Sequence, residues 1–297
     1  MSVLTAAPKP SNGQAKRRRG QDPGSIIGKP GFLTYGLLIA FVLGSAFPLY
    51  WSFLVASRDS SFTSQQLPPM WPGGNFLANA ARVFDTAPFW AALGNSLIVG
   101  TVVTVSVVFF CTLAGYAFAK LNFRGNNALF AFVVATLSVP TQLGVIPMFM
   151  AMAELEMTGE LIAVILPNLV TAFGVFWMRQ YLVTAVPYEL LEAARMDGCS
   201  MIRTFWHVVL PAARPAAAIL ALFTFMTSWN DFLWPLVVLD PSNPTIQLAL
   251  EKLQSGYSVD YSLVLAGTTL ATLPILVIFI LLGRQIVSGI MQGAVKG

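Results

Sequence analysis

The sequence predicts an all-α polytopic membrane protein with six transmembrane helices. Only 10% of its 297 residues are charged and 56% are hydrophobic, whereas soluble domains carry about 25% charged residues. The mean hydropathy is +0.70. The few charges are also spaced so that long apolar stretches separate them. This composition excludes a water-soluble enzyme.

The six expected helices are the apolar stretches between successive charges, because a membrane helix needs roughly 20 mostly apolar residues. Five stretches contain no charge, and the one between Arg214 and Asp240 contains Asp231 alone. The predicted helices cover 32–56, 91–118, 128–150, 161–180, 215–238 and 262–283.

The orientation follows from the basic residues, which stay on the cytoplasmic side in short loops. With the N-terminus inside, all but three of the 17 Lys and Arg residues fall in inner segments, the exceptions being Arg58, Arg82 and Lys252. Both termini are therefore predicted to be cytoplasmic. The net charge of +4 reflects this topology and requires no nucleic-acid partner.

The N-terminal segment 1–31 is polar, rich in Pro, Gly and basic residues, and contains the run Lys16-Arg17-Arg18-Arg19. Such a segment cannot bury a core, so we predict a disordered cytoplasmic tail followed by a transmembrane domain over 32–297. The basic run is interpreted as a topology anchor, with a twin-arginine or nuclear signal as the alternative.

The sequence contains few residues of the kinds that form metal sites, disulfides or nucleotide-binding loops. The chain has one histidine, His207, and two cysteines, Cys111 and Cys199, so neither a clustered metal site nor a structural disulfide is expected. It has no G-x-x-x-x-G-K-[ST] phosphate loop, so the chain itself is not expected to bind ATP.

The inner connection between Arg179 and Arg214 is the longest, and it predicts a helix–glycine turn–helix element over 187–211. Pro187 suits the first turn of a helix, Gly198 suits the left-handed geometry that ends one, and Ser200 can cap the next. We expect the second helix to end at Pro211 and to place four residues on one apolar face, namely Ile202, Phe205, Trp206 and Val209. On physical grounds alone, an interfacial amphipathic connector is an equally good interpretation.

The residues of this element resemble the EAA loop of ABC-importer permeases, through which these subunits dock onto ATPase partners. The matching positions are Glu192, Ala193, Ala194, Asp197, Gly198, Phe205, Leu210, Pro211 and Pro215. The resemblance implies the ABC type I importer permease fold. It also implies that Ala193 and Ala194 enter a cleft on the ATPase, that Glu192 pairs with a basic group there, and that Gly198 makes the turn.

Two further matches resemble the maltose-type, carbohydrate-uptake branch, in its shorter permease kind. They are Ser228-Trp229-Asn230-Asp231-Phe232-Leu233-Trp234-Pro235 and the tail Gly293-Ala294-Val295-Lys296-Gly297. The resemblance implies a multi-pass protein of a prokaryotic plasma (inner) membrane. Its implied partners are a second homologous permease, a dimer of ATPase subunits and an extracytoplasmic sugar-binding protein. ATP and Mg would be bound by the ATPase, and no cofactor by this chain.

The resemblance also makes the outer loop 240–260 the contact with that binding protein. An ordinary solvated connector is the alternative.

Asp231 is the only charge inside a predicted helix, and such groups usually face a bundle interior or a water-filled path. It marks a candidate substrate path formed by Thr227, Ser228, Trp229, Asn230, Asp231 and Trp234. The alternative is a helix-packing or interfacial role for Asp231. Pro235 is expected to bend the fifth helix one turn earlier. Asn95 and Ser96 could line a cavity or bridge helices.

The function that these features predict is the permease subunit of an ATP-driven importer for a di- or oligosaccharide. The same machine could carry another solute, such as glycerol phosphate or a polyamine, although a phosphate would need Arg or Lys along the path. An ion-coupled secondary transporter is the alternative of a different class, and it would need several buried acids or bases.

Overall fold

The computed structural model describes residues 31–60, 70–255 and 259–294, except for the side chains of residues 282 and 284–294. The expectations for the basic tail and for the last three residues lie outside this range. The described residues form helices, with one isolated parallel bridge between Gly159 and Leu239. The chain divides into two units, 1–48 and 49–297.

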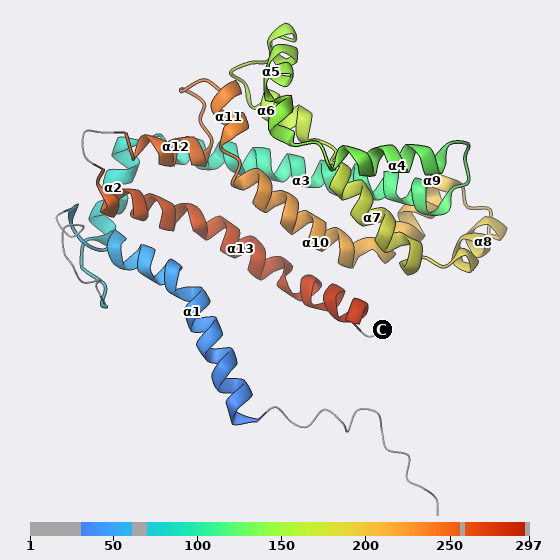
Figure 1. The fold of residues 1–297 in the computed structure, drawn as a ribbon, viewed down its shortest axis with the longest axis horizontal. Coiled ribbons are helices and arrows are strands. Elements are labelled where there is room, and N and C mark those ends of the chain that lie inside the picture. The colour runs from blue at the N-terminus through green and yellow to red at the C-terminus, as the bar shows by residue number, and fades with distance from the viewer. Residues whose placement is uncertain (1–30, 61–69, 256–258, 295–297) are drawn as a thin grey trace, which may run out of the picture. The chain divides into compact units, whose positions relative to one another are not determined.

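Five helices of the described residues are long and apolar enough to cross a membrane, and a sixth span results if one bent pair is counted. The long elements are α1 (Phe32–Ala56), α3 (Phe89–Lys120), α6 (Leu161–Ile165) with η4 (Leu166–Asn168) and α7 (Ala172–Ala185), α9 (Met201–Thr204) with η5 (Phe205–Val209) and α10 (Leu210–Trp229), and α13 (Tyr261–Ala294). The shorter helices are α2 (Phe76–Thr86), α8 (Tyr188–Met196), α11 (Leu233–Val238) and α12 (Ile246–Lys252). Figure 1 shows their order along the chain.

The third expected helix, 128–150, is not one straight helix. It is divided into α4 (Asn126–Thr136) and, after η3 (Thr141–Gly144), α5 (Val145–Glu154), with a bend of 93°. Pro140 explains the break, because its ring removes an N–H donor and disfavours helical geometry at Val139. α4 and α5 therefore make up the sixth span only if the bent pair is counted as one span.

The fifth expected helix begins earlier and ends earlier than predicted. α9, the π-helical η5 and α10 follow one another without interruption, so the helix runs through Pro211, where we expected a short helix to end. Within η5 the N–H of Leu210 bonds the carbonyl of Phe205. This wider turn changes the bonding register just before Pro211, whose missing N–H would otherwise interrupt an α-helix.

The same span ends at Trp229, and α11 is a separate helix. Asp231 therefore lies between two helices and not inside one, which corrects the prediction. Pro235 gives the reason, since it has no N–H for the carbonyl of Asp231 and its ring crowds that position. The bounds of α1 are as expected, and α3 and α7 are each extended by a few residues, whereas α13 begins where expected but continues to Ala294, past the expected end at residue 283.

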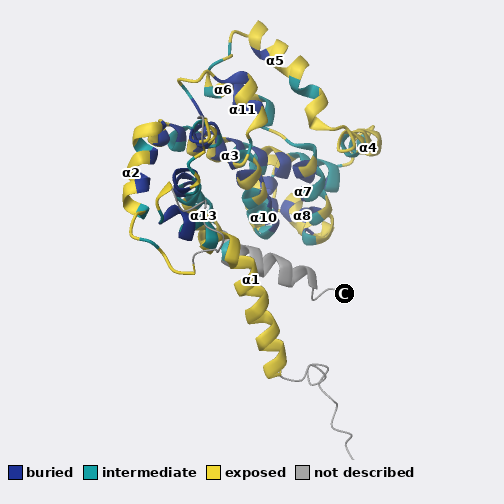
Figure 2. Ribbon diagram, turned by 60° about the vertical axis from the view of Figure 1, so that its left-hand side comes forward, coloured by how far each residue is buried: buried dark blue, intermediate teal, exposed yellow. Residues whose placement is uncertain are grey.

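α3 packs closely against α7 and α10 through glycines. A Cβ added at Gly115 would lie 2.8 Å from the backbone N of Arg179, one at Gly174 would lie 2.6 Å from Cys111 Sγ, and one at Gly100 would lie 2.9 Å from the ring of Phe225. Small residues let membrane helices approach one another in this way. Figure 2 shows the buried residues on the facing sides of α3, α7 and α10.

A second group of buried apolar residues joins α2, α12 and the first half of α13 to the start of α3 and the end of α10.

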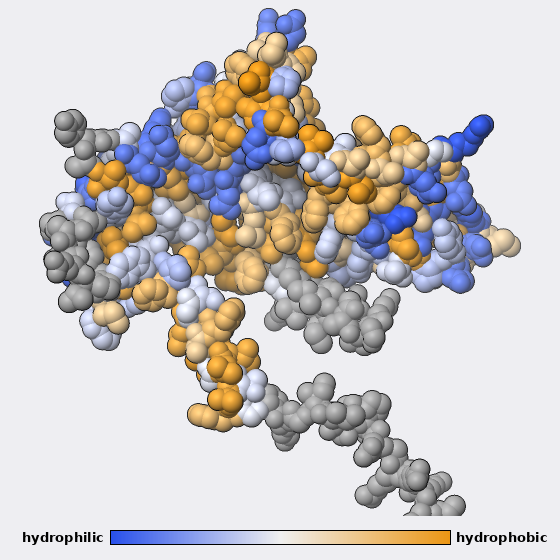
Figure 3. All heavy atoms as spheres, in the orientation of Figure 1, coloured by the Kyte–Doolittle hydropathy of each residue, from blue (hydrophilic) through white to orange (hydrophobic). Residues whose placement is uncertain are grey.

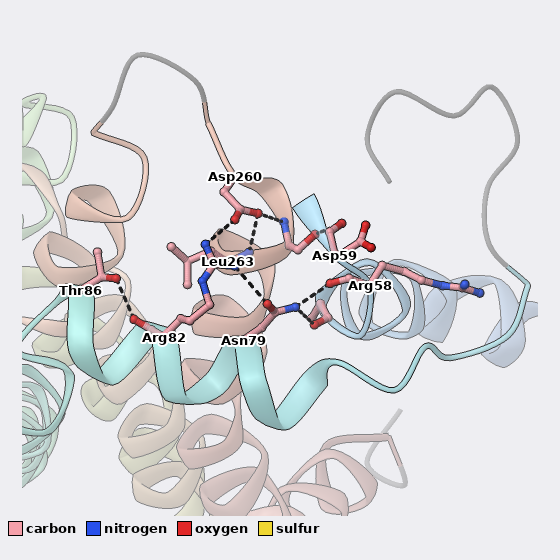
Figure 4. A network of polar contacts seen from close by, with 9 residues as sticks. Arg58, Asp59, Asn79, Arg82, Thr86, Asp260 and Leu263 are labelled. Carbon is pink, nitrogen blue, oxygen red and sulfur yellow. Dashed lines mark hydrogen bonds and ion pairs between the residues drawn. The ribbon is translucent and has the colours of Figure 1, made fainter. Parts of the chain in front are cut away.

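Hydrogen bonds and an ion pair also connect the elements of this region (Figure 4). Arg82 Nη2 lies 2.7 Å from Asp260 Oδ2, while Asp260 Oδ1 accepts the N–H groups of Ser262 and Leu263 and so caps α13. Asn79 donates to the carbonyl of Ala56 at 2.9 Å, which ties the end of α1 to α2.

Candidate functional site

The inner connection folds as a helix, a tight glycine turn and a second helix, as predicted. α8 ends in a Schellman motif, in which the N–H of Cys199 bonds the carbonyl of Ala194 at 2.9 Å and the N–H of Gly198 bonds that of Arg195 at 3.0 Å. Gly198 has φ +75°, a conformation that costs other residues about 1–2 kcal/mol. Ser200 Oγ then accepts the N–H of Arg203 and caps α9.

Burial divides the nine matching positions of this loop, of which Leu210 and Pro215 are half-buried. Glu192, Ala193, Asp197 and Gly198 are exposed on α8 and its turn, and Pro211 is exposed on α10. Ala194 is 7% exposed and packs inward, with Leu191 beside it. The exposed residues form a polar, small-residue surface that a partner can approach closely.

Phe205 belongs to the interior and not to the exposed surface of the loop. It is 2% exposed, and its ring centroid lies 6.1 Å from that of Phe109 and 6.1 Å from that of Tyr116, both on α3. Of the apolar face expected on the second helix, Phe205 and Val209 are buried, but Ile202 and Trp206 are 71% and 49% exposed. Only half of that face is therefore buried, although the exposed Trp206 also contacts α3, with its ring centroid 5.9 Å from that of Phe109.

The break between α10 and α11 contains Asp231, which is half-buried. Its Oδ1 accepts the backbone N–H of Trp234 at 3.4 Å, so the carboxylate caps the start of α11. Its neighbours Thr227 and Asn230 are exposed. Each bonds a carbonyl of its own helix, Thr227 that of Thr224 and Asn230 that of Met226.

The two tryptophans of the candidate path are both buried. Trp229 is 2% exposed and stacks on Phe225 with centroids 5.4 Å apart. Trp234 is 9% exposed, and its Nε1 donates to the carbonyl of Ala163 at 3.0 Å. These indoles hold the break in place, whereas Thr227 and Asn230 are exposed and Asp231 is half-buried.

The outer loop that follows α11 is fastened to the outer end of α3. Asn95 donates to Asn243 Oδ1 at 2.8 Å and to the carbonyl of Pro244 at 2.9 Å. Ser96 Oγ accepts the N–H of Ile246 at 2.8 Å. Asn95 and Ser96 thus bridge this loop to α3, which is one of the two uses that the sequence left open.

Part of the outer loop is itself helical and buried. Ile246, Leu248, Ala249 and Leu250 of α12 are each less than 9% exposed, and Gln247 donates to the carbonyl of Trp229 at 3.2 Å. Pro241 and Ser242 are exposed, and residues 256–258 lie outside the described range. Among the described residues of the expected contact loop, the exposed ones are Asp240, Pro241, Ser242, Glu251, Gln254, Ser255 and Val259.

Residues 111–291 match the family described as "Binding-protein-dependent transport system inner membrane component". The chain belongs to this family. The predicted family is thereby confirmed, and a permease of this family works with a separate ATPase and a binding protein. The chain is a multi-pass permease of the bacterial inner membrane and not the ATPase subunit.

Several related permeases match nearly the whole chain. It is 35% identical over 270 residues to the arabinooligosaccharides transport system permease protein AraQ of Halalkalibacterium halodurans, covering 89% of this chain and 96% of that protein. It is 34% identical over 269 residues to the lactose transport system permease protein LacG of Rhizobium radiobacter, covering 90% and 97%. It is 31% identical over 265 residues to the sn-glycerol-3-phosphate transport system permease protein UgpE of Yersinia enterocolitica, covering 86% and 94%.

The fold also matches a solved structure. A chain of a bacterial ABC transporter involved in the import of the acidic polysaccharide alginate superposes with a TM-score of 0.73 and 21% identity, over 85% of this permease and 94% of that chain. The ABC-importer permease fold is thus confirmed. An ion-coupled secondary transporter does not fit this family.

Proposed function

We propose that this permease imports a di- or oligosaccharide that an external solute-binding protein delivers. The relatives whose names refer to arabino-oligosaccharides and lactose share 35% and 34% of their residues with it. The observation that carries the proposal is the break between α10 and α11. It presents the hydroxyl, amide and carboxylate of Thr227, Asn230 and Asp231, groups that hydrogen-bond sugar hydroxyls.

The charge of this segment argues against an anionic solute. No Lys or Arg lies between Arg214 and Lys252, and the half-buried carboxylate of Asp231 would repel a phosphate. Glycerol phosphate, the solute named for the relative at 31% identity, is therefore the second candidate.

The proposed complex contains this chain, a second homologous permease, two ATPase subunits and the binding protein. The surface formed by Glu192, Ala193, Asp197 and Gly198 docks the ATPase, because small side chains allow close approach and a carboxylate provides a charge-assisted hydrogen bond. Ala194 and Phe205 support this surface from within. ATP and Mg are bound by the ATPase, and this chain binds no cofactor.

Uptake into vesicles containing the whole complex tests the proposal. With ATP inside and the loaded binding protein outside, we expect uptake of an arabino-oligosaccharide or lactose to exceed that of glycerol phosphate. Asp231→Ala is expected to lower sugar uptake about tenfold, equivalent to one strong hydrogen bond of roughly 1.4 kcal/mol, while the complex still assembles.

Asp85→Ala is the matched control, because Asp85 is an exposed aspartate on α2, outside the expected contact loop. We expect it to leave uptake unchanged. Unchanged uptake by Asp231→Ala would give Asp231 a structural role only, and preferential uptake of glycerol phosphate would overturn the sugar assignment.

A further inference from the structure

Lys120 is a buried cation at the inner end of α3. Lys120 is only 5% exposed, although long basic side chains at helix ends usually reach water. Nζ donates to the carbonyl of Val183 at 2.9 Å and lies 4.5 Å from the ring centroid of Tyr188. A buried ammonium is costly unless such partners compensate it.

The carbonyl that Lys120 binds lacks its usual partner. Val183 lies in the last turn of α7, and in a continuing helix its carbonyl would accept the N–H of residue 187. Residue 187 is proline and has no N–H. The ammonium of Lys120 takes the place of that donor at the joint between α7 and α8.

Tyr188 makes a contact in the opposite direction, from α8 to the end of α3. It is the first residue of α8, and its hydroxyl donates to the carbonyl of Ala119 at 3.4 Å. Ala119 lies in the last turn of α3, where carbonyls have no partner within their own helix. Tyr188 thus caps the end of α3 that carries Lys120, and Lys120 caps the end of α7, which leads into α8.

The two contacts join elements that have different roles. α8 carries the proposed ATPase surface, whereas α3 is 32 residues long and extends about 48 Å at 1.5 Å per residue. At the far end of α3, Asn95 and Ser96 hold the outer loop through Asn243 and Ile246. In Figure 1, α8 lies beyond the inner ends of α3 and α7.

We propose that Lys120 and Tyr188 form a clasp that transmits movement of α8 to α3, and so connects ATPase closure with the outer loop. This proposal rests on the docking of the ATPase at α8. An open surface hollow of about 520 Å³ beside Tyr188, lined also by residues 118, 119, 121–124, 126 and 127, leaves space for α8 to move if the clasp is absent. Lys120 and Tyr188 are therefore positioning residues.

The test uses the complete complex with its binding protein and measures three quantities: co-purification of the ATPase, basal ATP hydrolysis, and its stimulation by sugar-loaded binding protein. Lys120→Met keeps the apolar stem and removes the ammonium. We expect assembly and basal hydrolysis to stay within about twofold of wild type, and stimulation and uptake to fall roughly five- to tenfold.

Lys120→Arg keeps the charge and is expected to retain most of the stimulation. Arg124→Met is the matched control, because Arg124 is an exposed cation in the same inner connection, and it is expected to remain fully coupled. The double variant Lys120→Met with Tyr188→Leu should lose no more than the worse single variant, because the pair acts as a unit.

Full stimulation in Lys120→Met, equal loss in Arg124→Met, or additive losses in the double variant would each overturn the clasp. So would a Lys120→Met complex that fails to assemble while Tyr188→Phe stays fully coupled, since the role would then be structural. Absence of the ATPase from the wild-type preparation would instead contradict the proposed docking surface.

Discussion

At the scale of single residues, burial separates the side chains that build each motif from those that can meet a partner. In the α10–α11 segment, Trp229 is buried while the adjacent Asn230 is exposed. In the inner loop, Ala194 packs inward while Glu192 and Ala193 face outward. A helix places successive residues on different faces, so adjacent members of one motif have different tasks.

Substitution of Glu192 tests directly whether its exposed carboxylate docks the ATPase. Combining Glu192→Lys with Gly198→Pro reverses the docking charge and places a residue locked near φ −65° where the backbone has φ +75°. We expect the ATPase to be lost from the purified complex, as measured by co-purification with the tagged permease.

Glu251→Lys is the matched control, because it reverses an exposed acid on α12, at the other end of α3. It should leave the yield of ATPase unchanged. Wild-type recovery of the ATPase by the double variant would remove this loop from the docking surface.

At the scale of helices, the spacing of charges was sufficient to find the spans, but prolines and local bonding decided their limits. The gaps between charges placed α1 and α3 within a few residues of their observed bounds. They could not show that Pro140 bends the third span by 93° while Pro211 leaves the helix uninterrupted. The difference depends on the π-helical turn at Phe205–Val209, which has no recognised pattern in a single sequence.

The candidate site, like the helix limits, could be predicted from the sequence only in part. The resemblance placed Glu192 and Gly198 in the inner loop, where Gly198 and Ser200 have the conformations that their residue types favour. Asp231 was expected inside a helix, but it lies between α10 and α11. The clasp has no signature in the sequence, in which Lys120 is one of many cations on the inner side. Its significance depends on Pro187, which is distant in sequence, and only the packing of α3 against α7 brings the two together.

The close contact between α3 and α7 predicts a strong effect of a single methyl group. Gly115→Ala adds a Cβ 2.8 Å from both Arg179 N and Met178 Cβ, so the helices must separate. Overpacking of this kind costs about 1–3 kcal/mol, and we expect a lower Tm for the purified permease complex in detergent.

Gly94→Ala is the control on the same helix, because a Cβ there meets nothing within 4 Å. It should leave Tm unchanged or raise it slightly, since alanine favours helices over glycine by about 1 kcal/mol. Equal Tm values for the two variants would show that α3 and α7 are not in close contact.

At the scale of the whole molecule, the connections assigned to each side of the membrane gather at opposite ends of α3. Its last residue, Lys120, contacts the joint before α8, whereas α2, α12 and the start of α13 pack around its first turns. Figure 3 shows hydrophilic side chains at the end that carries α8 and again around α12, with mostly apolar ones between. Polar surfaces at both ends with an apolar surface between them fit a helix bundle that crosses a membrane.

The orientation can be measured with two single-cysteine variants in a Cys111→Ala, Cys199→Ser background. Ser242 is exposed just beyond α11, and Met196 is 89% exposed at the end of α8. A membrane-impermeant maleimide added outside spheroplasts should label Ser242→Cys at once and Met196→Cys only after permeabilisation. Because the positive-inside rule places the basic inner loops in the cytoplasm, the reverse pattern would invert the permease. The surface around Glu192 would then face away from any cytoplasmic ATPase, so this labelling result decides whether the docking surface is on the side where ATP is hydrolysed.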